Sequence, residues 1–145
     1  MTYGWAILII LVMIAALVYF GVFNPSKLTP ERCQAEPGFG CSDYQIKVGE
    51  AHFKIQNAKG DSLTVQGGWA INSSAPSLNC GCTTGISAGS SWASDVVMDV
   101  DCTGCTALNT AVGDRQKLTM SGYYQAKGGS FTKVFRLDTS ATVSS

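Results

Sequence analysis

Residues 3–23 read YGWAILIILVMIAALVYFGVF, a run of 21 residues without a charged side chain. As an α-helix this run would be about 31 Å long, which matches the hydrocarbon core of a bilayer. Aromatic side chains at both ends suit the membrane interfaces, and Asn24-Pro25 supplies a stop because proline lacks the helical donor. The sequence therefore predicts a transmembrane helix in a first segment, residues 1–23, that ends near Phe23.

Small residues along this helix would let two helix backbones approach closely in apolar surroundings. We predict an interhelical contact surface; an ordinary signal anchor is the alternative, because glycine and alanine are common in any membrane helix. A cleaved secretory peptide is disfavoured, since no basic segment precedes the run and no A-x-A-like site follows it. The predicted contact surface consists of Gly4, Trp5, Ala6, Leu8, Leu11, Ala15, Ala16 and Gly21.

The charge balance and the cysteines restrict the class of protein. Ten lysine and arginine residues balance ten aspartate and glutamate residues, so we expect no nucleic-acid partner. All six cysteines follow the apolar run, an even number that suits an oxidising compartment. Lys27 and Arg32 would by the positive-inside rule place the remainder in the cytoplasm. The cysteines carry more weight, and we predict an extracytoplasmic body.

Residues 24–42 are predicted to form a linker and a loop. The segment contains three prolines and two glycines and shows no apolar periodicity. Cys33 and Cys41 lie in it, and we expect them to form a disulfide. Closing so short a loop would restrain it by about 2 to 3 kcal/mol.

Residues 43–145 are predicted to form a small β domain. Apolar residues alternate with polar ones over 46–55, 63–71 and 96–100, and two further strands are expected at 117–126 and 131–139. Turn residues predict one hairpin at 57–61 and another at 127–129. Six or seven short strands of this kind are typical of a β-sandwich.

Four cysteines in two close pairs allow two interpretations. Cys80 and Cys82, with Cys102 and Cys105, could hold zinc through four thiolates. Two disulfides explain the same spacing and suit an oxidising compartment better. Which cysteine of the first pair would meet which of the second is left open by the sequence.

Other candidate residues favour structural roles. His52 is the only histidine and falls on the polar face of a strand, where solvent contact is the simpler interpretation than general-base catalysis. Asp95, Asp99 and Asp101 are expected on one strand face, without the glycine-containing loop of a calcium site. Asn72 begins an Asn-Ser-Ser sequon and is a candidate glycosylation site. No residue is assigned a catalytic role.

The N-terminal region resembles archaeal type IV pilin-like proteins. The resemblance rests on residues 1–8, on the apolar continuation to Ser26, and on Cys33 and Cys41 around Pro37-Gly-Phe-Gly. It implies that a class III signal peptide is removed by a prepilin peptidase, that the mature helices pack into a filament core, and that β-sandwich heads face outward. The family's leader, cleavage site and N-terminal glutamate are absent from this sequence, so we expect residues preceding Met1 in the gene product.

Together these features predict an α+β chain, with a long apolar N-terminal helix followed by a small disulfide-stapled antiparallel β-sandwich head. The predicted function is that of a structural subunit of an extracellular pilus-like filament on the cell surface. It would assemble with copies of itself after contact with the membrane and the pilus assembly machinery, and it would use no cofactor. The alternative is a monomeric, membrane-anchored binding module, an adhesin or a minor pilus component. A metal-binding or redox head is a third hypothesis.

Overall fold

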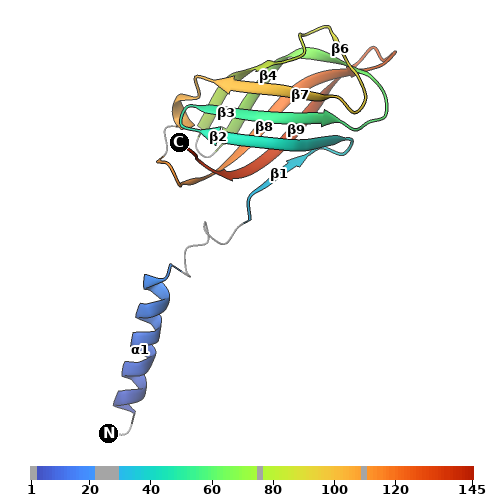
Figure 1. Ribbon diagram of the computed structural model, residues 1–145. Helices are drawn as coiled ribbons and strands as arrows, with labels where there is room; N and C mark the ends of the chain where they lie inside the picture. The colour runs from blue at the N-terminus through green and yellow to red at the C-terminus, as the bar shows by residue number, and fades with distance from the viewer. Residues whose placement is uncertain (1–2, 22–29, 75–76, 109–110) are drawn as a thin grey trace. The chain divides into compact units, whose positions relative to one another are not determined.

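The structure is a computed structural model that describes residues 3–21, 30–74, 77–108 and 111–145 (Figure 1). The chain divides into two compact units. The first extends to Pro30 and contains one helix, and the second, Glu31–Ser145, contains the strands and is called the β domain.

Helix α1 extends over Gly4–Tyr19, and a glycine, Gly21, follows its end. Gly21 has φ of +66°, a conformation that glycine adopts without steric cost and that terminates helices. The Phe20 N–H donates to the Ala16 carbonyl at 2.9 Å, and the Gly21 N–H donates to the Val18 carbonyl at 3.0 Å. The 16 residues of α1 make a helix about 24 Å long.

The predicted transmembrane helix over residues 3–23 is wrong. Within the described ranges, no helix is both long enough and apolar enough to cross a membrane. The helix stops at Gly21, before the expected stop at Asn24-Pro25, which lies outside the described residues. The predicted α+β architecture, with a long apolar helix and a small β head, is also wrong, because α1 is short and most of the chain is antiparallel β-structure.

The strands of the β domain form a single sheet in which every pair of neighbouring strands is antiparallel. The order is β1-β9-β8-β4-β5-β7-β3-β2, and the short β6 pairs with β4. One 3-10 turn, η1, separates β7 from β8. The elements are β1 Arg32–Ala35, β2 Phe39–Lys47, β3 Glu50–Asn57, β4 Leu63–Ser74, β5 Ser77–Thr84, β6 Ser91–Trp92, β7 Val97–Thr103, η1 Thr106–Leu108, β8 Arg115–Ala126 and β9 Thr132–Thr142.

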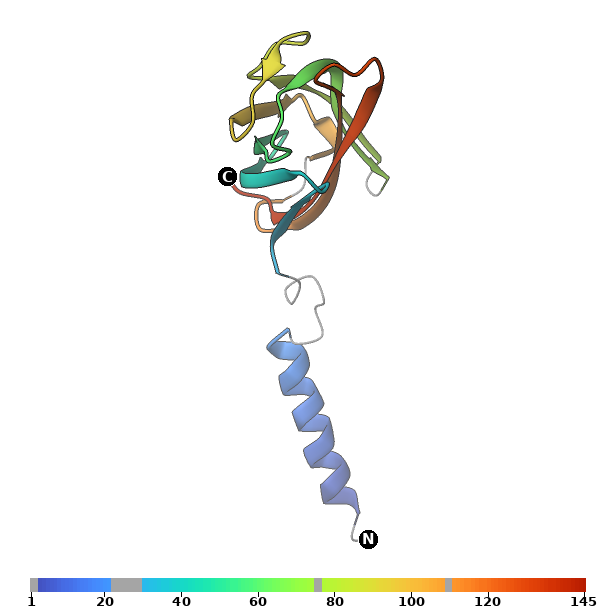
Figure 2. The ribbon, with the colours of Figure 1, turned by 90° about the vertical axis from the view of Figure 1, so that its right-hand side faces the viewer.

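Strand β5 makes the sheet continuous because it pairs with different neighbours along its length. Its first part pairs with β4, where Cys80 lies opposite Ile71. Its last part pairs with β7, where Cys82 lies opposite Cys102. The sheet therefore turns a corner between Cys80 and Cys82, and it rolls round the interior as Figure 2 shows.

The two edges of the rolled sheet meet at β1 and β2. A disulfide between Cys33 and Cys41 ties these strands together, with Cα atoms 6.0 Å apart. Beyond the end of β9, the Ser144 N–H and hydroxyl donate to the Ile46 carbonyl of β2 at 2.8 and 3.0 Å. The sheet is thus nearly closed into a barrel, with links at two points along its seam.

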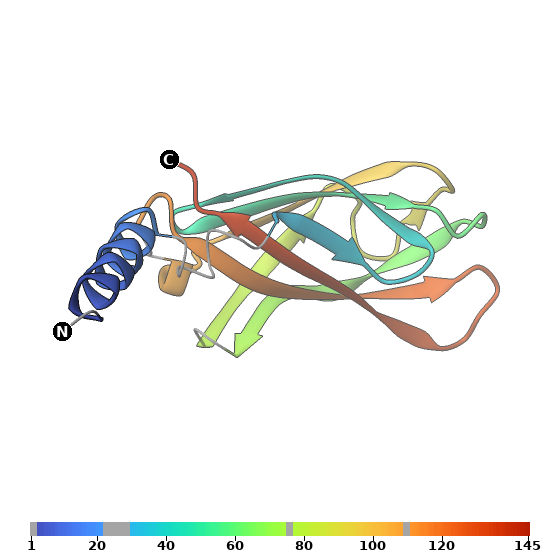
Figure 3. The same cartoon turned by 90° about the horizontal axis from the view of Figure 1, so that it is seen from below.

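The expected β-sandwich is therefore wrong. A sandwich needs two separate sheets, whereas β5 belongs to both halves of this one. The segment 24–42, expected as linker and loop, contains β1 and the start of β2. The predicted hairpin at 127–129 is confirmed, since β8 and β9 pair over their length as a long twisted ribbon (Figure 3).

The expected hairpin at 57–61 is wrong because the chain crosses between the two halves of the sheet there. Strand β3 pairs with β2 and β7, and β4 pairs with β5, β6 and β8. Asn57 supports this crossing from a fully buried position. Its side-chain amide donates to the carbonyls of Asp61, Trp92 and Ala93 at 2.8 to 3.2 Å, and its Oδ1 accepts from the Lys59 N–H.

Aromatic side chains fill the interior of the barrel. The Phe39 ring lies 5.6 Å from the Trp92 ring, 5.2 Å from Tyr124 and 4.8 Å from Phe135, measured between centroids. Trp69 continues the cluster at 5.3 Å from Phe135. These contacts join β2 to β8 and β9 across the interior, so the barrel is a packed core without α1.

An irregularity in β4 brings Trp69 into this core. Three residues, Gly67, Gly68 and Trp69, stand opposite the single Gly122 of β8, so the strand bulges. The Trp69 indole N–H then donates to the Gln66 carbonyl at 2.8 Å. A Cβ atom at Gly122 would lie 2.3 Å from the Trp69 ring, so only glycine leaves room for the indole.

Gly122→Ala should lower the free energy of unfolding by about 1 to 3 kcal/mol, because the indole must move to accommodate the methyl group. Urea unfolding followed by tryptophan fluorescence measures the change. Gly67→Ala is the matched control in the same bulge, since its Cβ would meet nothing within 4 Å. Equal effects of the two substitutions would contradict the packing of Trp69 on Gly122.

Glu31 holds the start of the β domain to the end of β9. Its carboxylate accepts hydrogen bonds from the Thr142 hydroxyl and from the Thr142 N–H, the latter at 3.0 Å. These two bonds, assisted by the charge of Arg115, lower the pKa of Glu31 below the usual value of 4.5. A carboxyl group whose pKa is lower in the folded state stabilises the fold above its unfolded-state pKa.

Glu31→Gln should therefore reduce stability near pH 7, and its difference from the native chain should shrink as the pH falls through the lowered pKa of Glu31. Urea midpoints at about pH 7 and about pH 3 test this. Glu36→Gln is the control, because the Glu36 carboxylate makes no hydrogen bond or ion pair within the described residues. A difference that persists unchanged at the lower pH would refute the contribution of the Glu31 carboxylate.

Candidate functional site

Helix α1 presents an apolar surface on all sides, and none of its residues is buried. Leu8 and Leu11 are 61% and 62% exposed, and Trp5 is 70% exposed. An α-helix that is apolar all round is normally covered, by a protein core or by other apolar surroundings. The surface of α1 is therefore the first candidate site.

The predicted helix contact residues lie in α1 with one exception. Gly4, Leu8, Leu11 and Ala15 follow one another at intervals of four and three residues, so they share one face of the helix. Trp5, Ala6 and Ala16 lie on neighbouring parts of the same helix. Gly21 follows the helix and terminates it, which is a different role from the predicted one.

All six cysteines are in disulfides. Cys80 is bonded to Cys105, and Cys82 is bonded to Cys102 directly across the β5–β7 pair. Three of these four cysteines are buried, with Cys82 partly exposed. Because every cysteine sulfur is in a disulfide, the alternative zinc site has no thiolate ligands.

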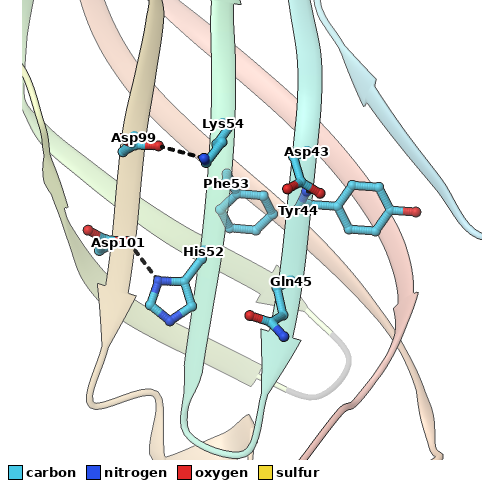
Figure 4. Close-up of a pocket in the computed structure, with 8 residues that line it drawn as sticks. All are labelled: Asp43, Tyr44, Gln45, His52, Phe53, Lys54, Asp99 and Asp101. Carbon is cyan, nitrogen blue, oxygen red and sulfur yellow. Dashed lines mark hydrogen bonds and ion pairs between the residues drawn. The ribbon is translucent and has the colours of Figure 1, made fainter.

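A shallow depression lies on the outer face of β2, β3 and β7 and is the second candidate site (Figure 4). Its volume is about 260 Å³. Three carboxylates surround it, and the lining residues are Asp43, Tyr44, Gln45, His52, Phe53, Lys54, Asp99 and Asp101.

His52 lies on this outer face between two carboxylates. Its Nδ1 is 2.7 Å from Asp101 Oδ1 on β7, and its Nε2 is 3.5 Å from Glu50 Oε2 on β3. A second ion pair joins the same two strands, with Lys54 Nζ 4.0 Å from Asp99 Oδ1. Both ring nitrogens of His52 therefore face acids, and the residues that line the depression include no serine, threonine or cysteine nucleophile.

The acidic residues are less clustered than the sequence predicts. Asp99 and Asp101 share the outer face of β7, but Asp95 precedes the strand with φ of +62°. No group of three or more metal-ligating side chains converges in the described ranges. The pairing of His52 with Asp101 escaped sequence analysis, because the spacing of 49 residues does not reveal that β3 and β7 are neighbours.

Tyr44 lies at the seam of the barrel, beside the depression. Partial burial and then the negative charge of Glu31 raise the pKa of its phenol, so it remains protonated at neutral pH. Its ring packs against the core from the inner side of β2. Tyr44 is thus a packing residue of the seam, and no catalytic role follows from it.

Asn72, the candidate glycosylation site, is exposed near the end of β4. Its side-chain amide donates to the Ser121 hydroxyl of β8 at 3.1 Å. The structure places Asn72 in a strand, where an N-linked glycan would be attached to the same amide nitrogen.

Comparisons with protein families, with curated proteins and with solved structures found no match for this chain. The features of the chain that bear on function are therefore α1, the disulfides and the outer faces of the β domain.

The disulfide pairing predicts a specific pattern of thiols. Cys82→Ser with Cys102→Ser removes one bonded pair and should leave no free thiol in denaturant without reductant. Cys82→Ser with Cys105→Ser removes one member of each pair and should leave two free thiols, Cys80 and Cys102. Thiol titration distinguishes these outcomes, and a native chain with four titratable thiols would contradict the pairing and revive the zinc site.

Proposed function

We propose that this protein is a non-catalytic structural subunit that assembles with copies of itself through helix α1 outside the cytoplasm. The β domain would remain at the surface of the assembly. The observation that carries this proposal is the uncharged, exposed surface of α1 in a chain whose β domain has a packed core of its own.

Association stabilises the chain because it removes the apolar side chains of α1 from water. Fully covering one leucine or isoleucine side chain contributes about 1.5 to 3 kcal/mol. Thirteen large apolar or aromatic side chains from Tyr3 to Tyr19 are exposed, so covering them contributes more than the entropy cost of association. An isolated, water-exposed α1 is therefore not the working state of the chain.

A second copy of α1 is the partner that the chain itself offers. The other exposed large apolar side chains described in the β domain are Val48, Val96, Val97, Val112, Tyr123, Phe131 and Val134. These residues are spread over several strands and turns and form no apolar surface as long as α1. Small residues on α1, such as Gly4 and Ala15, favour close packing between equivalent helices.

Three disulfides support an extracytoplasmic location, since thiols inside the cytoplasm are kept reduced. The resemblance of residues 1–45 to archaeal pilin-like proteins favours a pilus-like filament on the cell surface as the form of the assembly. Before assembly, lipid and the assembly machinery would cover the apolar side chains of α1.

Leu11→Glu should raise the protein concentration required for assembly by at least about 100-fold, because it places a carboxylate in the contact and removes a buried leucine. Glutamate is a good helix former, so α1 should remain helical. Analytical ultracentrifugation without detergent measures the assembly, and circular dichroism measures the helix.

Asn79→Glu is the matched control, because it adds the same charge at an exposed position of uncharged β5 and should leave assembly intact. A native chain that stays monomeric in the absence of detergent would overturn the proposal. A chain that is monomeric and found only with lipid would instead favour the monomeric binding module.

A further inference from the structure

The strands on one side of the barrel are basic. Strands β1, β8 and β9 carry five cations and one carboxylate, Asp138, which accepts a hydrogen bond from Thr119. Glu31 and Glu36, which flank β1, add two carboxylates, so cations remain in excess on this side. Within the described chain, three of the cations make no ion pair. These three are Arg32, Lys133 and Arg136, and the basic face also includes Arg115 and Lys117.

A second group of strands is acidic. Strands β2, β3 and β7 carry four carboxylates against two lysines, and the carboxylates line or border the depression of Figure 4. All four carboxylates are exposed. The acidic face consists of Asp43, Glu50, Asp99 and Asp101.

Uncharged strands separate the two faces. Strands β4 and β5 lie between β8 and β7 in the sheet, and neither contains a charged residue. Basic and acidic residues of the β domain are therefore concentrated on different strands, which β4 and β5 separate on one side and which meet at the seam between β1 and β2, although the whole chain has no net charge. Surfaces of opposite charge attract one another and determine the orientation of docking.

The basic face also contains a polar group that lacks a partner. Ser140 of β9 is paired in register with Arg32 on β1 and with Lys117 on β8, so one hydroxyl stands between two cations. Its Oγ has no hydrogen-bond partner, and the residue is 6% exposed. A carboxylate arriving beside Arg32 is the complementary group for this hydroxyl and its neighbouring cation.

We propose that the basic face of one copy docks on the acidic face of a second copy. The inference deepens the proposed function, on which it rests, by adding a contact between β domains to the contact between helices. Because the two faces differ, the contact is heterologous, and a docked pair retains one free basic face and one free acidic face. Such a contact propagates along an open row of subunits.

The test uses the full chain and two double variants. The first, Arg32→Glu with Arg136→Glu, reverses charges on the basic face; the second, Asp43→Lys with Glu50→Lys, reverses charges on the acidic face. Each variant alone should require about tenfold more protein to assemble at low salt, because like charges then meet. Mixing the two variants should restore assembly, since every contact again joins opposite charges. Asn79→Glu is the control on uncharged β5.

Sedimentation from about 0.02 M to about 0.5 M NaCl provides the readout, because salt screens exposed charges. The difference between each variant and the native chain should disappear at the higher salt. Unchanged assembly of both single-face variants, or no rescue on mixing, would overturn the docking of the two faces and leave assembly through α1 in place. A native chain that does not assemble at any salt would overturn both proposals.

Discussion

The pairing of β5 with both β4 and β7 is the constraint on which the β domain depends. If β5 paired with one neighbour only, the strands would separate into two sheets with exposed edges. The disulfides from Cys80 to Cys105 and from Cys82 to Cys102 fix β5 at this corner. The third disulfide, with the contact of Ser144 to Ile46, holds the seam on the other side of the barrel. A small domain thereby buries its core without help from α1.

The apolar side chains of α1 give this helix its significance. None of its residues is buried. Its apolar residues are thus available for contacts with other molecules. The β domain contributes a different kind of surface, charged and segregated by sign, which suits the orientation of neighbours more than the strength of their attachment.

Local patterns in the sequence predict local structure well. Alternation over residues 46–55 and 96–100 corresponds to β3, the end of β2 and β7, and Gly128 and Gly129 mark the turn between β8 and β9. Spacing could not reveal which strands are neighbours, because Asn57 carries the chain across the barrel where a hairpin is the simpler expectation. The end of α1 was misplaced because an apolar run hides the effect of Gly21, whose left-handed conformation stops the helix.

Electron microscopy of material sheared from cells, with mass spectrometry to identify the subunit, tests the central claim most directly. The account predicts thin filaments or other ordered assemblies in which this chain is the repeating subunit. Recovery of the chain only as a dispersed monomer, with no assembly that contains it, would contradict the role assigned to α1.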